Sequence, residues 1–282
     1  MARTPDFEIG QTLLRAGGMW RRNLLKLGGV ILAFSAVGGA IQVGVTALNG
    51  GFASAGVPAE PSSTGSIVGA IVSLAMALVI GALIGGVNGH ASEAEVRGEK
   101  ATFVGGWNAA WRNFLPQLGI QLILGVLFVI AAFVSALFGI FFIVPFLVSL
   151  ALIIAFLGLA PMIQVAERQG VFASLSASIN AGEGNHLKML GYYIIAYIGA
   201  VVGLLIAYLV MALLMGLAFG AAGLTGAFDT DGEFPIGIVL FAVPLYLVFS
   251  AAIPLAAGAV PGSVYVSLRK HRSQHAVSSV FD

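Results

Sequence analysis

The chain has 282 residues, of which 59% are hydrophobic and 9% are charged, and its mean hydropathy is +1.01. A soluble domain carries about 25% charged residues, so this chain cannot cover a globular surface with polar groups, and soluble enzyme folds are excluded. A net charge of +1 argues against nucleic-acid binding. The lack of cysteine removes disulfide and thiolate chemistry. These properties predict an all-α protein that crosses a membrane several times.

Six apolar stretches are long enough to cross a bilayer, for which a helix needs roughly 20 apolar residues. The predicted spans are residues 26–48, 66–88, 117–138, 141–163, 188–220 and 236–266. The third and fourth spans form one apolar stretch, which we divide near Gly139. The fifth is longer than a bilayer requires, so we expect it to tilt or to project beyond the bilayer. Pro244, Pro254 and Pro261 predict a kinked last span.

The basic residues all fall on one side of this predicted topology. Lys and Arg occur in the N-terminal segment, in the loops after the second and fourth spans, and in the C-terminal tail. The opposite loops hold Glu60, Asp229, Asp231 and Glu233 instead. Because cytoplasmic loops are enriched in Lys and Arg, we predict cytoplasmic N- and C-termini and a multi-pass protein of a bacterial-type inner (plasma) membrane. The first span lacks a cleavage signal and is expected to be retained.

Three segments that lead into the first, third and fifth spans resemble one another. Each holds an asparagine that is followed by a glycine five or six residues later. These residues are Asn23, Asn113 and Asn185, with Gly28, Gly119 and Gly191. We predict one integral membrane domain made of three repeats, each an amphipathic segment followed by a helical hairpin. The repeats cover about residues 6–92, 93–166 and 167–270, and residues 271–282 form a cytoplasmic tail.

The amphipathic segments have helical spacing of their apolar residues. Leu13 and Trp20 share one face of the first segment, and Phe103, Trp107 and Trp111 share one face of the second. Helices with Trp or Phe on one face and Arg on the other are typical of the membrane interface. We therefore predict cytoplasmic elbow helices, with the alternative that these segments are simply the starts of long spans. The predicted fold is a helix bundle of six spans, arranged as three hairpins with elbows.

A turn and two flanking segments carry a resemblance to a known family. A Glu167-Arg168-Gln169-Gly170 turn leads to the Ser-rich segment 174–178 and to an Asn-x-Leu start at Asn185, and the last span ends Tyr-Val-Ser-Leu-Arg at 265–269. With the Trp-containing first segment, this pattern resembles the membrane domain of the glycerophosphoryl diester phosphodiesterase family over nearly the whole chain. The resemblance implies a membrane fold. In some relatives a catalytic barrel domain follows this membrane domain. The sequence ends at Asp282, so we expect no positions here that match the catalytic residues of the family.

Clusters of acidic residues raise the question of a metal site. His90, Glu93, Glu95 and Glu99 lie in the predicted loop after the second span, but their spacing fits no ligand pattern, and a solvated loop face is favoured. The acidic run from Asp229 to Glu233 is interpreted as a turn. We expect no catalytic residue, no cofactor and no metal, and therefore no hydrolytic activity in the purified protein.

The predicted spans contain no ionisable residue away from their ends, which disfavours a proton-coupled pump. Gln42 and Gln121 are interpreted as hydrogen-bonding residues between helices. Glycines that recur every fourth residue, as at 81, 85 and 89 or at 199 and 203, are expected to pack helices within the bundle, with dimerisation as the alternative.

The leading hypothesis is a non-enzymatic inner-membrane protein that organises or handles lipids or partner proteins in the envelope. The alternative is a transporter or facilitator of a small or lipid-like molecule. The expected partners are anionic membrane lipids, with a second copy or another membrane protein on the glycine faces, and no nucleic acid. The candidate lipid-headgroup residues are aromatic or basic and flank the elbows: Trp20, Arg21, Arg22, Lys26, Trp111, Arg112 and Lys188.

Overall fold

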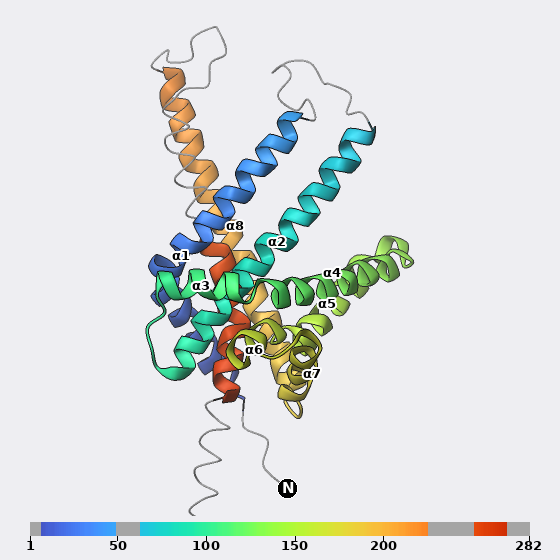
Figure 1. The fold of residues 1–282 in the computed structure, drawn as a ribbon. Helices are drawn as coiled ribbons and strands as arrows, with labels where there is room; N and C mark the ends of the chain where they lie inside the picture. The colour runs from blue at the N-terminus through green and yellow to red at the C-terminus, as the bar shows by residue number, and fades with distance from the viewer. Residues whose placement is uncertain (1–6, 49–62, 225–250, 270–282) are drawn as a thin grey trace, which may run out of the picture.

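In a computed structural model of the chain, residues 7–48, 63–224 and 251–269 are described, and their regular elements are all helical (Figure 1). In chain order these are α1 (Ile9–Leu48), α2 (Ser63–Arg97), α3 (Phe103–Arg112), α4 (Phe114–Ala136), the 3₁₀ turn η1 (Gly139–Phe141), α5 (Ile143–Leu157), α6 (Ala160–Glu167), α7 (Val171–Ala181) and α8 (His186–Leu224). The last described element, Ala251–Arg269, is here named the C-terminal helix. The prediction of an all-α fold is confirmed for these residues.

Five helical stretches of the described chain are long and apolar enough to cross a membrane. They are Ile9–Ile41, Gly69–Arg97, Phe114–Ala136, Ile143–Glu167 and Ala251–Arg269. The predicted fifth span lies in α8, a single helix of 39 residues. The start of the predicted sixth span, with Pro244, and the acidic outer residues Glu60, Asp229, Asp231 and Glu233 lie outside the described residues.

The predicted division of the long apolar stretch near Gly139 is confirmed. Helix α4 ends at Ala136 and η1 begins at Gly139, whose φ of 55° lies in the left-handed region that favours glycine. A second break, which the sequence analysis did not predict, divides the fourth span into α5 and α6. It lies at Gly158 and Leu159, and Pro161 follows in the first turn of α6, where its missing N–H costs no helical hydrogen bond.

The predicted elbows differ from one another in structure. Residues 9–24 are continuous with the first span, since α1 runs for 40 residues without interruption. By contrast, α3 and α7 are separate short helices that precede α4 and α8. Thr102 caps α3 by accepting a hydrogen bond from the backbone N–H of Gly105 at 3.1 Å. The first segment is therefore the start of a long helix, which is the alternative given above. The second and third segments form separate short helices, α3 and α7.

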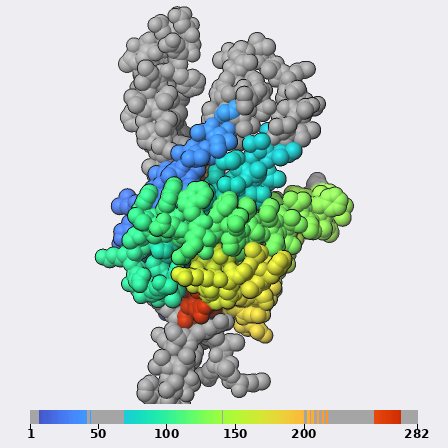
Figure 2. All heavy atoms as spheres, in the orientation of Figure 1, coloured from blue at the N-terminus to red at the C-terminus, as the bar shows by residue number. Residues whose placement is uncertain are grey.

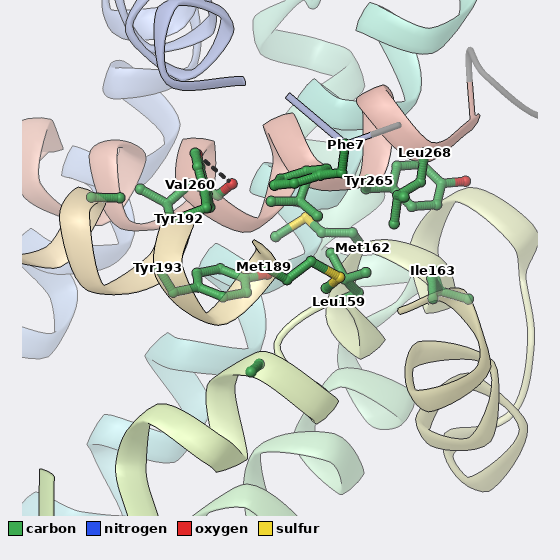
Figure 3. Close-up of a cluster of buried hydrophobic side chains, with 13 residues drawn as sticks. Phe7, Leu159, Met162, Ile163, Met189, Tyr192, Tyr193, Val260, Tyr265 and Leu268 are labelled. Carbon is green, nitrogen blue, oxygen red and sulfur yellow. Dashed lines mark hydrogen bonds between the residues drawn. The ribbon is translucent and has the colours of Figure 1, made fainter. Parts of the chain in front are cut away.

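The C-terminal helix lies inside the bundle, with 72% of its most apolar stretch buried. Little of it is visible on the face shown in Figure 2. Three other helices donate side-chain hydrogen bonds to its carbonyl groups. Trp20 Nε1 bonds Ala252 O at 3.0 Å, Asn88 Nδ2 bonds Pro254 O at 3.2 Å, and Tyr192 Oη bonds Val260 O at 3.1 Å. The last of these joins Tyr192 and Val260, two members of the buried cluster drawn in Figure 3. Among the five stretches long enough to cross a membrane, the last one is thus the most enclosed.

Glycines on α2 pack directly against its neighbours, as predicted for the bundle. A Cβ added at Gly86 would lie 2.7 Å from the Cα of Ala110 in α3, and one at Gly89 would lie 2.5 Å from Val165 in α6. Gly81 faces Gln121 of α4 at 3.8 Å by the same measure. Close approach of this kind needs a residue without a side chain. For Gly199, on α8, the described residues offer no neighbour within 4 Å.

Candidate functional site

The predicted headgroup residues lie at one end of the bundle, here named the base. The base holds the beginnings of α1 and α8, the end of α2 and helices α3, α6 and α7 (Figure 1). Contacts between distant segments define it: Thr12 Oγ1 lies 3.3 Å from Ser267 Oγ, and Glu167 pairs with Arg269. The described ends of the chain therefore meet at the base.

The two predicted tryptophans occupy different environments. Trp20 is half-buried, packs against Met19, Ala259 and Val266, and donates its indole N–H to the C-terminal helix. Trp111 is 53% exposed. Trp20 therefore has a packing role within the bundle, whereas Trp111 presents its ring at the surface, as a headgroup contact requires.

The predicted basic residues also divide into two groups. Arg22 Nη2 donates to both carboxylate oxygens of Glu95, each at 2.9 Å, which neutralises its charge. Arg21, Lys26 and Arg112 are exposed, and the described residues supply no ion pair to them. Lys188 is exposed as well. An exposed ion pair such as the one at Arg22 stabilises by only about 0–1 kcal/mol, so its main effect here is on the distribution of charge.

Three aromatic rings, each from a different helix, gather around Trp111. The Phe34 ring of α1 stacks on Trp107 with a centroid distance of 4.9 Å, and Trp107 lies 6.2 Å from Trp111. Phe114, at the start of α4, lies 6.2 Å from Trp111. At the start of α3, Phe103 covers Gly29 of α1. The spacing of apolar residues predicted the aromatic face of α3. It did not predict the ring contacts of Phe34, because Phe34 lies within the predicted first span.

We name the exposed side chains of this region the aromatic–basic surface: Lys26, Phe103, Trp107, Trp111 and Arg112. Phe103 is 49% exposed and Trp107 is 37% exposed. The opposite face of α3 consists of the buried small residues at 106, 109 and 110, which lets α3 lie against the α2 backbone. The packing of α3 therefore turns its aromatic rings outward, together with basic groups to which the described part of the chain supplies no ion pair. Such a surface fits the boundary between acyl chains and anionic headgroups.

A buried amide network on α4 and α6 was not predicted as a group. Gln117 Nε2 donates to Pro161 O and to Gln164 Oε1, each at 2.8 Å, and Gln164 Nε2 donates to Asn113 Oδ1 at 3.3 Å. Ser178 Oγ donates to Phe156 O at 2.8 Å. Irregular backbone at membrane depth must have its polar groups satisfied. These side chains therefore hold the break between α5 and α6.

Of the residues considered as metal ligands, His90, Glu93 and Glu95 belong to helix α2, not to a loop as predicted, whereas Glu99 lies in the connection to α3. Glu93 is buried and pairs with Arg97 at 2.6 Å, while Glu95 pairs with Arg22. Among the described residues, no group of three or more His, Cys, Asp or Glu could hold a metal ion. The carboxylates in this region thus serve as partners of arginines.

Comparison with known proteins found no matching family model, no matching curated protein and no matching solved structure. The resemblance to the membrane domain of the glycerophosphoryl diester phosphodiesterase family stays a prediction from sequence.

Proposed function

We propose that the chain is a non-enzymatic integral protein of a bacterial-type inner membrane that organises anionic lipids, with the base on the cytoplasmic side. The aromatic–basic surface carries this proposal. It combines three exposed aromatic residues of α3 with Lys26 and Arg112, and the described residues offer these cations no carboxylate. Each basic residue near an anionic leaflet contributes on the order of 1 kcal/mol to membrane binding.

We also propose that the chain contains three hairpin repeats. Residues at equivalent positions of the three repeats are buried or exposed alike, which supports this proposal. The asparagines at 23, 113 and 185 are all buried, and the residues four and seven positions later have 0% exposure in each case: Leu27 and Val30, Gln117 and Ile120, Met189 and Tyr192. The leucine two positions after each asparagine is exposed: Leu25 by 92%, Leu115 by 74% and Leu187 by 85%.

The glycine six positions after each asparagine supports the same proposal. A Cβ at Gly29 would meet Phe103 at 3.3 Å, one at Gly119 would meet Val171 at 2.9 Å, and one at Gly191 would meet Ile9 at 3.8 Å. Phe103, Val171 and Ile9 are the first residues of α3, α7 and α1. Each hairpin thus receives the start of the next repeat, and the third receives the start of the first, which is the closure expected of three equivalent units.

One observation favours a transporter as the second candidate. The stretch Ile143–Glu167 is interrupted between α5 and α6, and discontinuous spanning helices often line substrate sites in transporters. Its carbonyl groups at Phe156 and Pro161 are occupied by Ser178 and Gln117, which favours a structural role for the break. Uptake of a solute by vesicles that contain only this protein would favour the transporter instead.

Replacing Arg21, Lys26 and Arg112 by glutamine should lower the amount of anionic lipid retained after purification in mild detergent by at least several-fold. The same variant should lose thermal stability in anionic bilayers and not in neutral ones, because its target is headgroup charge. Native mass spectrometry and melting curves measure the two effects. The matched control replaces Arg168, Lys270 and Arg272 by glutamine, which removes the same number of positive charges at positions outside α1 and α3. Equal losses in both variants would contradict a specific surface.

Reporter fusions test the proposed orientation independently. Fusions after Arg97, Arg168 and Arg272 should report the cytoplasm, because basic loops stay inside. Fusions near Glu60 and Asp231 should report the opposite side. A cytoplasmic signal at Asp231 would overturn the six-span topology.

A further inference from the structure

A small cavity lies between α1, α2 and the C-terminal helix, apart from the aromatic–basic surface. Its volume is about 10 Å³, and the residues around it include Trp20, Asn23, Asn88, Ser92 and Leu255. None of its lining residues is charged. A cavity of on the order of 10 Å³ is the smallest that accommodates a water-sized group, provided that polar atoms line it.

Asn23 is the unusual member of this lining. The residue is 8% exposed, and the described residues give its side chain no hydrogen bond. Its amide atoms are not among the fully enclosed atoms without a partner, so they keep a narrow contact with the outside of the bundle. Asn88 uses its Nδ2 to donate to Pro254 O, and no donor to its oxygen exists in the same part of the chain. An amide that is largely removed from water and has no protein partner is stabilised by a group that hydrogen-bonds to it, so a hydrogen-bonding occupant of the cavity is expected.

The second repeat shows how a protein group fills the corresponding position. Asn113 accepts a hydrogen bond from Gln164 at 3.3 Å and donates one to Ala109 O at 2.8 Å. The glutamine lies six residues before Gly170, and in the first repeat the residue six before Gly98 is Ser92. Serine is too short to replace the glutamine amide. The first repeat therefore has a cavity beside Asn23, where the second repeat has a side chain.

We propose that this cavity binds a neutral hydroxyl group, supplied by an ordered water molecule or by the free alcohol of a membrane lipid. A hydroxyl both donates and accepts, so it satisfies the Asn88 oxygen and the Asn23 amide together. A charged group is disfavoured because no opposite charge lines the cavity. The inference rests on the cavity and not on the aromatic–basic surface.

The test compares the wild-type protein with Asn23→Leu, which keeps the branched shape of the side chain and removes its hydrogen-bonding atoms. One measurement is a structure in neutral bilayers at a resolution that shows ordered water. The other is the melting temperature with added diacylglycerol and with its O-methyl ether, which lacks the free hydroxyl. The matched control is Asn113→Leu, which should lower stability by breaking protein hydrogen bonds while leaving the cavity intact.

If a lipid alcohol supplies the hydroxyl, diacylglycerol should raise the wild-type melting temperature and its O-methyl ether should not. Asn23→Leu should then bind diacylglycerol about tenfold more weakly. If an ordered water molecule supplies the hydroxyl, the structures of the wild type and of Asn113→Leu should show its density beside Asn23. Neither lipid should then change the melting temperature. An empty cavity with no lipid response in the wild type overturns the proposal, and so does a signal that survives Asn23→Leu. The wild-type measurements decide the matter even if a variant fails to fold.

Discussion

Replacing Gly86 by alanine is expected to destabilise the folded protein by about 1–3 kcal/mol, the usual cost of overpacking a close contact. The added Cβ would lie 2.7 Å from Ala110 Cα and 3.0 Å from Ala109 O, both backbone atoms of α3. Backbone cannot rotate away as a long side chain can, so α3 must move off α2. The aromatic rings of α3 would move with it, and thermal unfolding followed by tryptophan fluorescence should report both changes.

The matched control is Gly17→Ala on α1, where the described residues offer no neighbour within 4 Å of the added Cβ. Alanine is preferred over glycine inside a helix by about 1 kcal/mol, so this variant should be as stable as the wild type or slightly more stable. If Gly86→Ala and Gly17→Ala have the same melting temperature, the direct contact between the α2 and α3 backbones does not exist.

Ending the chain before Ala251 is expected to abolish the folded bundle. Removal of the C-terminal helix takes away the acceptors of Trp20, Asn88 and Tyr192 and exposes apolar surface from several helices at once. An unpaired polar group in hydrocarbon costs several kcal/mol, and three such groups exceed a typical stability of about 5–15 kcal/mol when the lost packing is included. Size-exclusion chromatography in detergent should show aggregation in place of a monodisperse peak.

A chain that ends after Lys270 is the control, because every contact described for the C-terminal helix is kept. This shorter deletion should give the wild-type elution profile and melting temperature. A monodisperse, thermally stable product from the longer deletion would show that the hairpins assemble without their central helix.

The sequence predicts the helical class and several boundaries because apolar length and glycine chemistry are local properties. Gly139 marks a turn in both the prediction and the structure, since glycine alone adopts its φ without strain. The break between α5 and α6 also has a local signal, with Gly158 and Pro161 close together in an apolar run. It was missed because the run was judged by its length alone.

The environment of each apolar face could not be predicted in the same way. Trp20 and Trp111 have similar neighbours in sequence, yet one packs against the C-terminal helix and the other is exposed. In a membrane, lipid and protein interior are equally apolar, so amphipathic spacing does not distinguish them. The cavity at Asn23 depends on helices that are distant in sequence, and only the three-dimensional arrangement brings Asn23 and Asn88 to the same space.

The central position of the C-terminal helix has a consequence for how the protein is made. Synthesis proceeds from the N-terminus, so α1, α2 and α8 leave the ribosome before the helix whose carbonyl groups they bond. Membrane helices first insert as separate units and then associate. Until that helix has been made, the nascent chain therefore has an indole, an amide and a phenol without their final acceptors. These donors distinguish an unfinished chain from one that has folded around the C-terminal helix.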